Sequence, residues 1–224
     1  MSIARAAAII LGKELRTELR ARELLSTTVV FALIVIVLFS FAFDPTSVET
    51  RRYGPGLLWI AFLFAGSLML NPTFAREQAN DTWSALRAAP VPAFAILLGK
   101  MLANLIFLLL TEIVLLPVFS VLYNVSLQGI LWRLATVLAL GTVGIVATGT
   151  VFSAISAQAR MREMLLPLLL LPVLVPVLIA AVEATVALIG DQPVLDRTWV
   201  TFLAGFDVVF LTASWLLCDY LMEE

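Results

Sequence analysis

The chain has 224 residues, of which 62% are hydrophobic and 13% are charged, about half the charged share of an average soluble domain. Its 14 basic and 16 acidic side chains give a formal net charge of −2, which argues against nucleic acid as a partner because nucleic-acid binding needs a basic excess. One small globular core cannot bury so much apolar surface. The composition therefore predicts an integral membrane protein that contacts the lipid bilayer.

The first segment, residues 3–23, has the pattern of an amphipathic helix. Leucine and alanine recur every fourth residue on one face, and three cations lie on another. These positions are Ala7, Leu11, Leu15 and Leu19 on the apolar face, and Lys13, Arg16 and Arg20 on the polar face. The segment lacks the apolar region of a secretory signal, so we expect it to persist as a cytoplasmic interfacial helix. Such a helix either only anchors the topology or also contacts a cytoplasmic partner.

Six apolar runs follow, each long enough to cross a bilayer core that needs about 20 helical residues. They occupy residues 24–43, 56–74, 96–123, 130–157, 164–189 and 198–221. The runs are solidly apolar and do not alternate with polar residues, so the fold predicted is an all-α integral membrane protein with six transmembrane helices.

Basic residues are distributed unevenly between the two sides of this arrangement. One side holds ten of them (Arg5, Lys13, Arg16, Arg20, Arg22, Arg76, Arg87, Lys100, Arg160 and Arg162), and the other holds four (Arg51, Arg52, Arg133 and Arg197). Because loops rich in Lys and Arg stay in the cytoplasm, both termini of this multi-pass protein are expected to be cytoplasmic.

A charged stretch at residues 76–87 joins the second and third spans on the cytoplasmic side. Its polar members are Arg76, Glu77, Asp81 and Arg87, and Pro90 and Pro92 follow it. Trp83 and Leu86 are spaced i,i+3 and form an apolar edge that a merely solvated loop does not need. The stretch therefore predicts a short helix that docks on a soluble motor protein.

The sequence offers little material for chemistry of its own. It contains no histidine, and Cys218 is its only cysteine, which removes the usual metal ligands, the commonest general base and any intrachain disulfide. The pairs Gly12-Lys13 and Gly99-Lys100 lack the other residues of a phosphate-binding loop. We therefore expect no catalytic site, no metal and no cofactor bound by this chain.

Three carboxylates fall within the spans and are candidates for function, because a charge in hydrocarbon is costly. Glu112 lies midway along the third span, near the kink candidate Pro117, and either serves a pathway or bonds a neighbouring helix as a protonated carboxyl. Glu183 and Asp207 lie nearer the span ends, where they can reach water.

Two further patterns concern helix packing. Gly149, Ser153 and Ala157 recur every fourth residue in the fourth span, a spacing that lets helix backbones approach, within the subunit or across a dimer. Three prolines in the fifth span, Pro167, Pro172 and Pro176, predict that this helix bends or opens locally.

Three segments carry a resemblance to a known family. They are "KELRTELRARE", "FAREQANDTWSALRAAPVPAFAILLGKML" and "REMLLPLLLLPVLVPVLIA". In these segments, its length and its six-span layout, the chain resembles CcmB, the permease subunit of the ABC-type haem exporter complex of cytochrome c maturation.

The resemblance implies a single permease domain over residues 1–224, of ABC exporter type, in the bacterial inner membrane. It also implies an ATPase subunit, CcmA, that carries the ATP, together with CcmC, CcmD and the haem chaperone CcmE, and two copies of this chain facing one another. Residues 76–87 would then be the coupling helix that seats in the ATPase.

Haem is a possible cargo, but a chain without histidine would leave the axial ligands of haem to a partner or to methionine. This favours a mechanical role that transmits conformational change. The alternatives are an ABC permease for another amphipathic substrate, a proton-coupled carrier using Glu112 and Asp207, and a structural scaffold.

Overall fold

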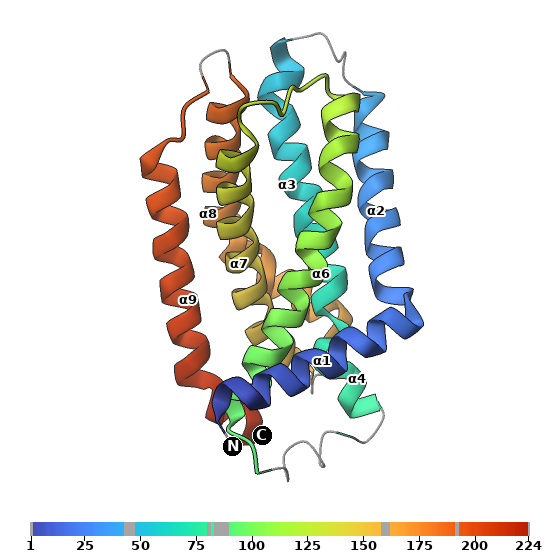
Figure 1. The fold of residues 1–224 in the computed structure, drawn as a ribbon, viewed down its shortest axis with the longest axis vertical. Helices are drawn as coiled ribbons and strands as arrows, with labels where there is room; N and C mark the ends of the chain where they lie inside the picture. Colours follow the sequence, from blue (N-terminus) through green and yellow to red (C-terminus); the bar gives the residue numbers. More distant parts are fainter. Residues whose placement is uncertain are drawn as a thin grey trace.

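The computed structural model describes residues 2–42, 48–79, 82, 90–157, 162–190 and 193–223. Over these residues the chain forms α-helices and no β-strand, which confirms the predicted all-α fold. The helices are α1 (Ile3–Ala21), α2 (Glu23–Ser40), α3 (Val48–Leu70), α4 (Pro72–Ala79), α6 (Ala93–Leu122), α7 (Leu131–Ser156), α8 (Arg162–Ile189) and α9 (Arg197–Glu223). Figure 1 shows the long helices side by side in one bundle, with α1 lying across one end.

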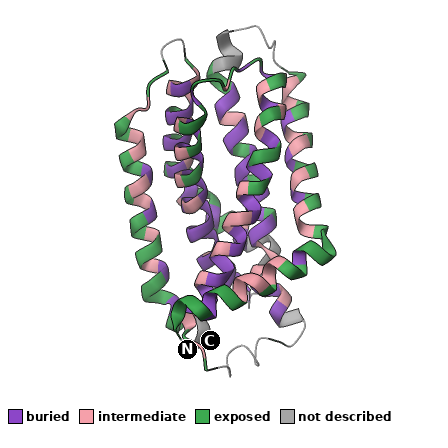
Figure 2. Cartoon of the chain, viewed as in Figure 1, coloured by how far each residue is buried: buried purple, intermediate pink, exposed green. Residues whose placement is uncertain are grey.

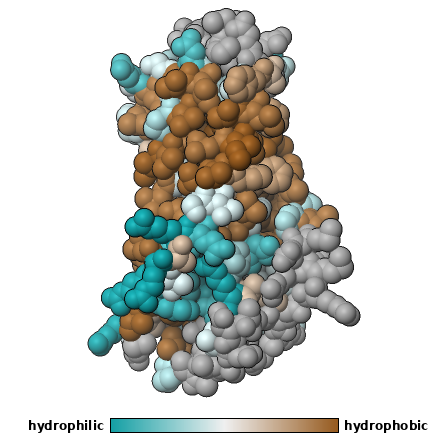
Figure 3. Space-filling view, turned by 90° about the vertical axis from the view of Figure 1, so that its right-hand side faces the viewer, coloured by the Kyte–Doolittle hydropathy of each residue, from teal (hydrophilic) through white to brown (hydrophobic). Residues whose placement is uncertain are grey.

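Six helical stretches among the described residues are long and apolar enough to cross a membrane. They are Glu23–Ser40, Arg52–Glu77, Ala93–Leu122, Leu131–Ser156, Leu166–Ile189 and Arg197–Leu221. The prediction of six spans is thereby confirmed, and the chain is a multi-pass membrane protein. Figure 3 shows the corresponding belt of apolar side chains, below which hydrophilic side chains gather.

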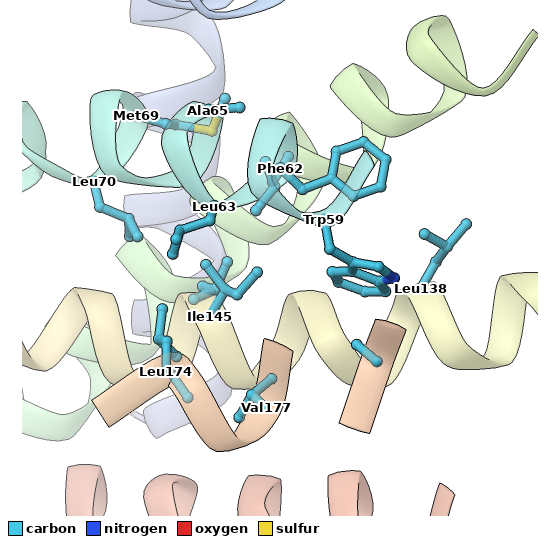
Figure 4. Close-up of a cluster of buried hydrophobic side chains, with 14 of the residues drawn as sticks. Trp59, Phe62, Leu63, Ala65, Met69, Leu70, Leu138, Ile145, Leu174 and Val177 are labelled. Atoms are coloured by element: carbon cyan, nitrogen blue, oxygen red, sulfur yellow. The ribbon is translucent and has the colours of Figure 1, made fainter. Parts of the chain in front are cut away.

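The helix at the centre of the bundle is α7. Its most apolar stretch is 72% buried, against 17% for α2 and for α9, which lie at the periphery. In Figure 2 the buried residues accordingly face the interior of the bundle. Glycines make this packing possible, because a methyl group at Gly141 would overlap the indole ring of Trp59 in α3. Figure 4 shows Trp59 pointing from α3 toward α7, and its Nε1 donates a hydrogen bond of 3.0 Å to Thr185 Oγ1 of α8.

The row of small residues in α7 packs within the chain. A methyl group at Gly149 would overlap the side chain of Leu70, and the Ser153 hydroxyl donates a hydrogen bond of 2.7 Å to the Leu70 carbonyl. Ala157 is buried as well. Of the two roles that the sequence left open, the structure shows packing of α7 against the end of α3.

The prolines of α8 do not open the helix. It stays helical from Arg162 to Ile189 through Pro167, Pro172 and Pro176. Of the two predicted outcomes, local opening is therefore absent from α8, and a bend stays a prediction.

The helix α1 is the predicted amphipathic segment. It ends at Ala21, and the next residue, Arg22, has a φ of 55° in the left-handed region, which turns the chain into α2. One face of α1 packs closely on α6: a Cβ added at Gly99 would lie 2.8 Å from Ile10 Cβ and 2.9 Å from the Ala7 carbonyl oxygen. We call the end of the bundle that carries α1 and α4 the α1 end; α1 begins and α9 ends there (Figure 1).

Candidate functional site

A buried lysine joins three helices at the α1 end. Lys100 lies in the second turn of α6, and its side chain is 1% exposed. Its ammonium group donates to both carboxylate oxygens of Glu77 in α4 at 2.8 Å, and to Glu14 Oε1 of α1 at 3.1 Å. The carbonyl of Thr73 accepts a further bond of 2.6 Å. An ammonium has three N–H donors, and three acceptor groups surround this one, so its hydrogen-bonding capacity is satisfied.

Glu77 is shared between two cations. Besides Lys100, Lys13 of α1 donates to Glu77 Oε1 at 2.8 Å and to Glu14 Oε1 at 3.3 Å. Burial would by itself lower the pKa of Lys13, but the hydrogen bond to Glu77 and the charges of Glu14 and Glu77 together raise this pKa above its ordinary value. Lys13 is 54% exposed and Lys100 is buried, so the two cations hold Glu77 from the solvent side and from the protein side.

A second ion pair ties α4 to α1 about one turn closer to the C-terminal end of α1. Arg76 Nη1 lies 3.5 Å from Glu18 Oε2, and Glu18 is 3% exposed. The same carboxylate accepts a hydrogen bond of 2.8 Å from the backbone N–H of Leu25, one of the N–H groups at the start of α2 without a helical partner. Glu18 therefore fixes the corner between α1 and α2 as well as the position of α4.

The interior of this site is nearly filled. A cavity of about 20 Å³, lined by residues that include Glu14, Arg76 and Lys100, has room for about one water molecule. Asn104 Nδ2 donates to Thr73 Oγ1 at 3.1 Å beside it, and the ring of Phe74 lies 5.0 Å from the Lys100 ammonium. We call Lys13, Glu14, Glu18, Arg76, Glu77 and Lys100 the Lys100 cluster.

The carboxylates of the spans lie apart from this cluster. Glu112 is buried between α6 and α7, where the Thr142 hydroxyl donates a hydrogen bond to its Oε1. Asp207 is 6% exposed and lies against Gly144, and among the described residues its Oδ1 has no hydrogen-bond partner. Thr142 and Gly144 point about 200° apart around α7, since a helix turns 3.6 residues per turn. Glu112 and Asp207 therefore lie on opposite faces of α7 and do not form one site.

The expectation that Asp207 can reach water is wrong, because it packs inward against α7 where glycine leaves space. Glu183 lies on the exposed surface of α8, within the candidate span Leu166–Ile189, and its contact with water stays a prediction.

Comparison with known proteins identifies the family. The family model described as "CcmB protein" matches residues 5–217. The chain belongs to the CcmB family. Curated CcmB-family relatives carry the name "Heme exporter protein B". That of Rhodobacter capsulatus is 33% identical over 174 residues, which are 78% of this chain and 79% of the relative. Those of Pseudomonas aeruginosa and Paracoccus denitrificans are both 31% identical, and they cover 92% of this chain and 91% and 93% of their own lengths.

In this CcmB-family chain, the structure brings two of the six predicted coupling residues together. Arg76 and Glu77 lie in α4, which is described as far as Ala79, and most of the predicted helix beyond it lies outside the described residues. Glu77 is buried and points into the protein, and not along a solvated rim. The remaining four, Asp81, Trp83, Leu86 and Arg87, lie outside the described residues, so docking through them stays a prediction.

Sequence reasoning missed Lys100 as a site residue in this family member. It is the only charged residue of the apolar run between Pro92 and Glu112, and Glu14 and Glu18 are spaced i,i+4 on one face of the preceding amphipathic helix. A single lysine in one apolar segment and two carboxylates on one face of another indicate a paired site. This pattern is visible in the sequence, but it does not show which carboxylate pairs with Lys100.

Proposed function

We propose that this chain is the membrane permease subunit of an ATP-driven haem exporter complex of cytochrome c maturation. The observation that carries the proposal is the CcmB match over residues 5–217. It is supported by two relatives named "Heme exporter protein B", which align with this chain over 91% and 93% of their lengths. The six candidate spans supply the membrane domain that such a subunit needs.

In this proposal the chain transmits conformational change from an ATPase subunit, CcmA, which holds the ATP. The short helix α4 follows α3 in the sequence, and residues 80–92 connect it to α6, so a force on this connection acts on two spans at once. Because Arg76 and Glu77 are engaged by α1 and α6, the contacts with CcmA are expected from Trp83 and Leu86, with Asp81 and Arg87 at the rim.

The other partners follow from the family. CcmC, CcmD and the haem chaperone CcmE complete the complex, and ATP hydrolysis releases haem-loaded CcmE. Two copies of this chain face one another in the bacterial inner membrane. The small-residue row of α7 is excluded from that contact, because Leu70 of the same chain already packs on it.

The α1 end is the cytoplasmic end in this arrangement. It carries the basic residues of α1 together with Arg76 and Lys100, which agrees with the positive-inside rule. Both termini are then cytoplasmic, as the ATPase position requires.

Affinity purification of the tagged chain, coexpressed with the other subunits, tests the proposal. The parent chain should retain an ATP-binding subunit, and the double variant Trp83→Ala with Leu86→Ala should release it, with a loss of affinity of roughly thirtyfold or more. A matched control removes a tryptophan and an aliphatic side chain at the opposite end, Trp132→Ala with Val121→Ala, both of which are exposed. The proposal is refuted when the parent chain retains no ATP-binding subunit.

A further inference from the structure

The Lys100 cluster has a geometry that a loop helix does not need merely to stay folded. Three helices that are far apart in the sequence converge on one buried ammonium, with Glu14 and Glu77 lying 86 and 23 residues from Lys100. A buried ion pair is weak evidence for stability, because apolar side chains of similar volume often replace one without loss. What such a cluster does provide is a fixed geometry, since moving any one helix breaks at least one ion pair of a buried charge.

The contacts fix α4 to α1 at two points. Glu77 is held by Lys13 and Lys100, and Arg76 is held by Glu18. These points, at Lys13 and Glu18, lie in the C-terminal half of α1, so sliding or rotating α4 along α1 breaks at least one of the two pairs.

The same region of α1 is seated on α6. The close approach of Gly99 to Ile10 and to the Ala7 carbonyl leaves no space for a methyl group, one residue before Lys100. The cavity beside Lys100 has room for about one water, and Lys100 is 1% exposed, so little solvent is available to replace the ion pairs of Lys100 itself. The three helices therefore form one body at the α1 end.

We infer that Lys100 is the positioning residue through which movement of α4 reaches α1 and α6. The inference rests on the proposed function, in which the ATPase subunit moves the segment that follows α4. It assigns α1 a role beyond anchoring: α1 moves with the loop and carries the displacement across the α1 end to α2, with which it shares the Glu18 corner.

The experiment uses the complex of the full chain with its ATPase subunit in lipid nanodiscs. Hydrogen–deuterium exchange is followed over α1 and α4, without nucleotide and with a non-hydrolysable ATP analogue. In the parent complex the analogue should change exchange in both helices. In Lys100→Met, the ATPase subunit stays bound and α4 still responds, but the response of α1 is lost, and α1 exchanges about tenfold faster or more without nucleotide.

The matched control is Arg20→Met, which removes an exposed cation of α1 that lies outside the Lys100 cluster. Because Arg20 contributes none of the contacts described for the cluster, this variant should keep the α1 response. Glu77→Gln carries the test independently if Lys100→Met does not fold, because it keeps an oxygen for Lys100 but removes the charge; it should weaken the α1 response.

The outcomes are distinct. An α1 response that persists unchanged in Lys100→Met or in Glu77→Gln overturns the inference and leaves the proposed function standing. A parent complex in which α4 responds and α1 does not overturns it as well. Failure of the parent chain to bind any ATPase subunit refutes the proposed function itself, and the inference with it.

Discussion

Thr142 of α7 donates a hydrogen bond to the buried carboxyl of Glu112 of α6, in the middle of the bundle. The pair joins two neighbouring spans, and Asp207 lies on the opposite face of α7. This arrangement fits a Glu112 carboxyl that bonds α6 to α7, which is one of the two roles that the sequence left open for it.

The first prediction is that Glu112→Gln keeps both folding and export. The amide of glutamine still accepts the bond from Thr142 but cannot exchange a proton, so only a proton-coupled mechanism should lose activity. Haem-dependent cytochrome c maturation in cells checks this, with the amount of membrane-inserted protein measured in parallel. Loss of maturation at a normal protein level would support the carrier that was considered as an alternative.

Removal of the Thr142 hydroxyl, unlike Glu112→Gln, should lower the stability of the protein. Thr142→Val keeps the shape of the side chain but leaves Glu112 without its donor, which should reduce stability by about 1–3 kcal/mol. Thermal unfolding of the purified chain, followed by tryptophan fluorescence, measures the effect. An unfolding temperature equal to that of the parent would show that the bond contributes nothing.

A pair of glycines tests how closely α1 is seated on α6. Gly99→Ala places a methyl group against Ile10 and the Ala7 carbonyl, so we expect α1 to be displaced at a cost of about 1–3 kcal/mol. Gly12→Ala in α1 is the control, because its added Cβ meets no atom of another helix within 4 Å, and it should stabilise the helix by up to about 1 kcal/mol. Limited proteolysis of residues 3–21 compares the two. Equal protection of α1 in both variants would contradict the close contact.

The orientation is tested by reporter fusions. A reporter after Glu224 should be active in the cytoplasm, and one inserted near Ser126, between α6 and α7, should be active in the periplasm. The structure places the α6–α7 connection at the end opposite α1, in keeping with the uneven distribution of basic residues. The reverse activity of either reporter would invert the proposed orientation.

The elements of this fold were predictable because each leaves a local signal. An apolar run of about 20 residues predicts a span without any tertiary information, and the four-residue spacing of Ala7, Leu11 and Leu15 predicts α1. The proline row of α8 was a weaker signal, and the helix accommodates it without a break.

The site depends on tertiary contacts and was predictable only in part. Arg76 and Glu77 were correctly placed on a helix, but their direction is decided by Lys13 and Lys100, which lie 64 and 23 residues from Glu77. The prediction that Asp207 reaches water failed for the same reason. Its exposure depends on packing against Gly144 of α7 and not on its position along the span.

The central claim is that this chain transmits the conformational change driven by ATP hydrolysis to a haem-carrying partner. The most direct measurement is the release of haem-loaded CcmE from membranes that contain the complete complex, on addition of ATP. The account predicts release with the active ATPase subunit and none with a subunit that binds but cannot hydrolyse ATP, while the amount of this chain stays equal. Equal release from both membranes would contradict the account and leave the chain a scaffold.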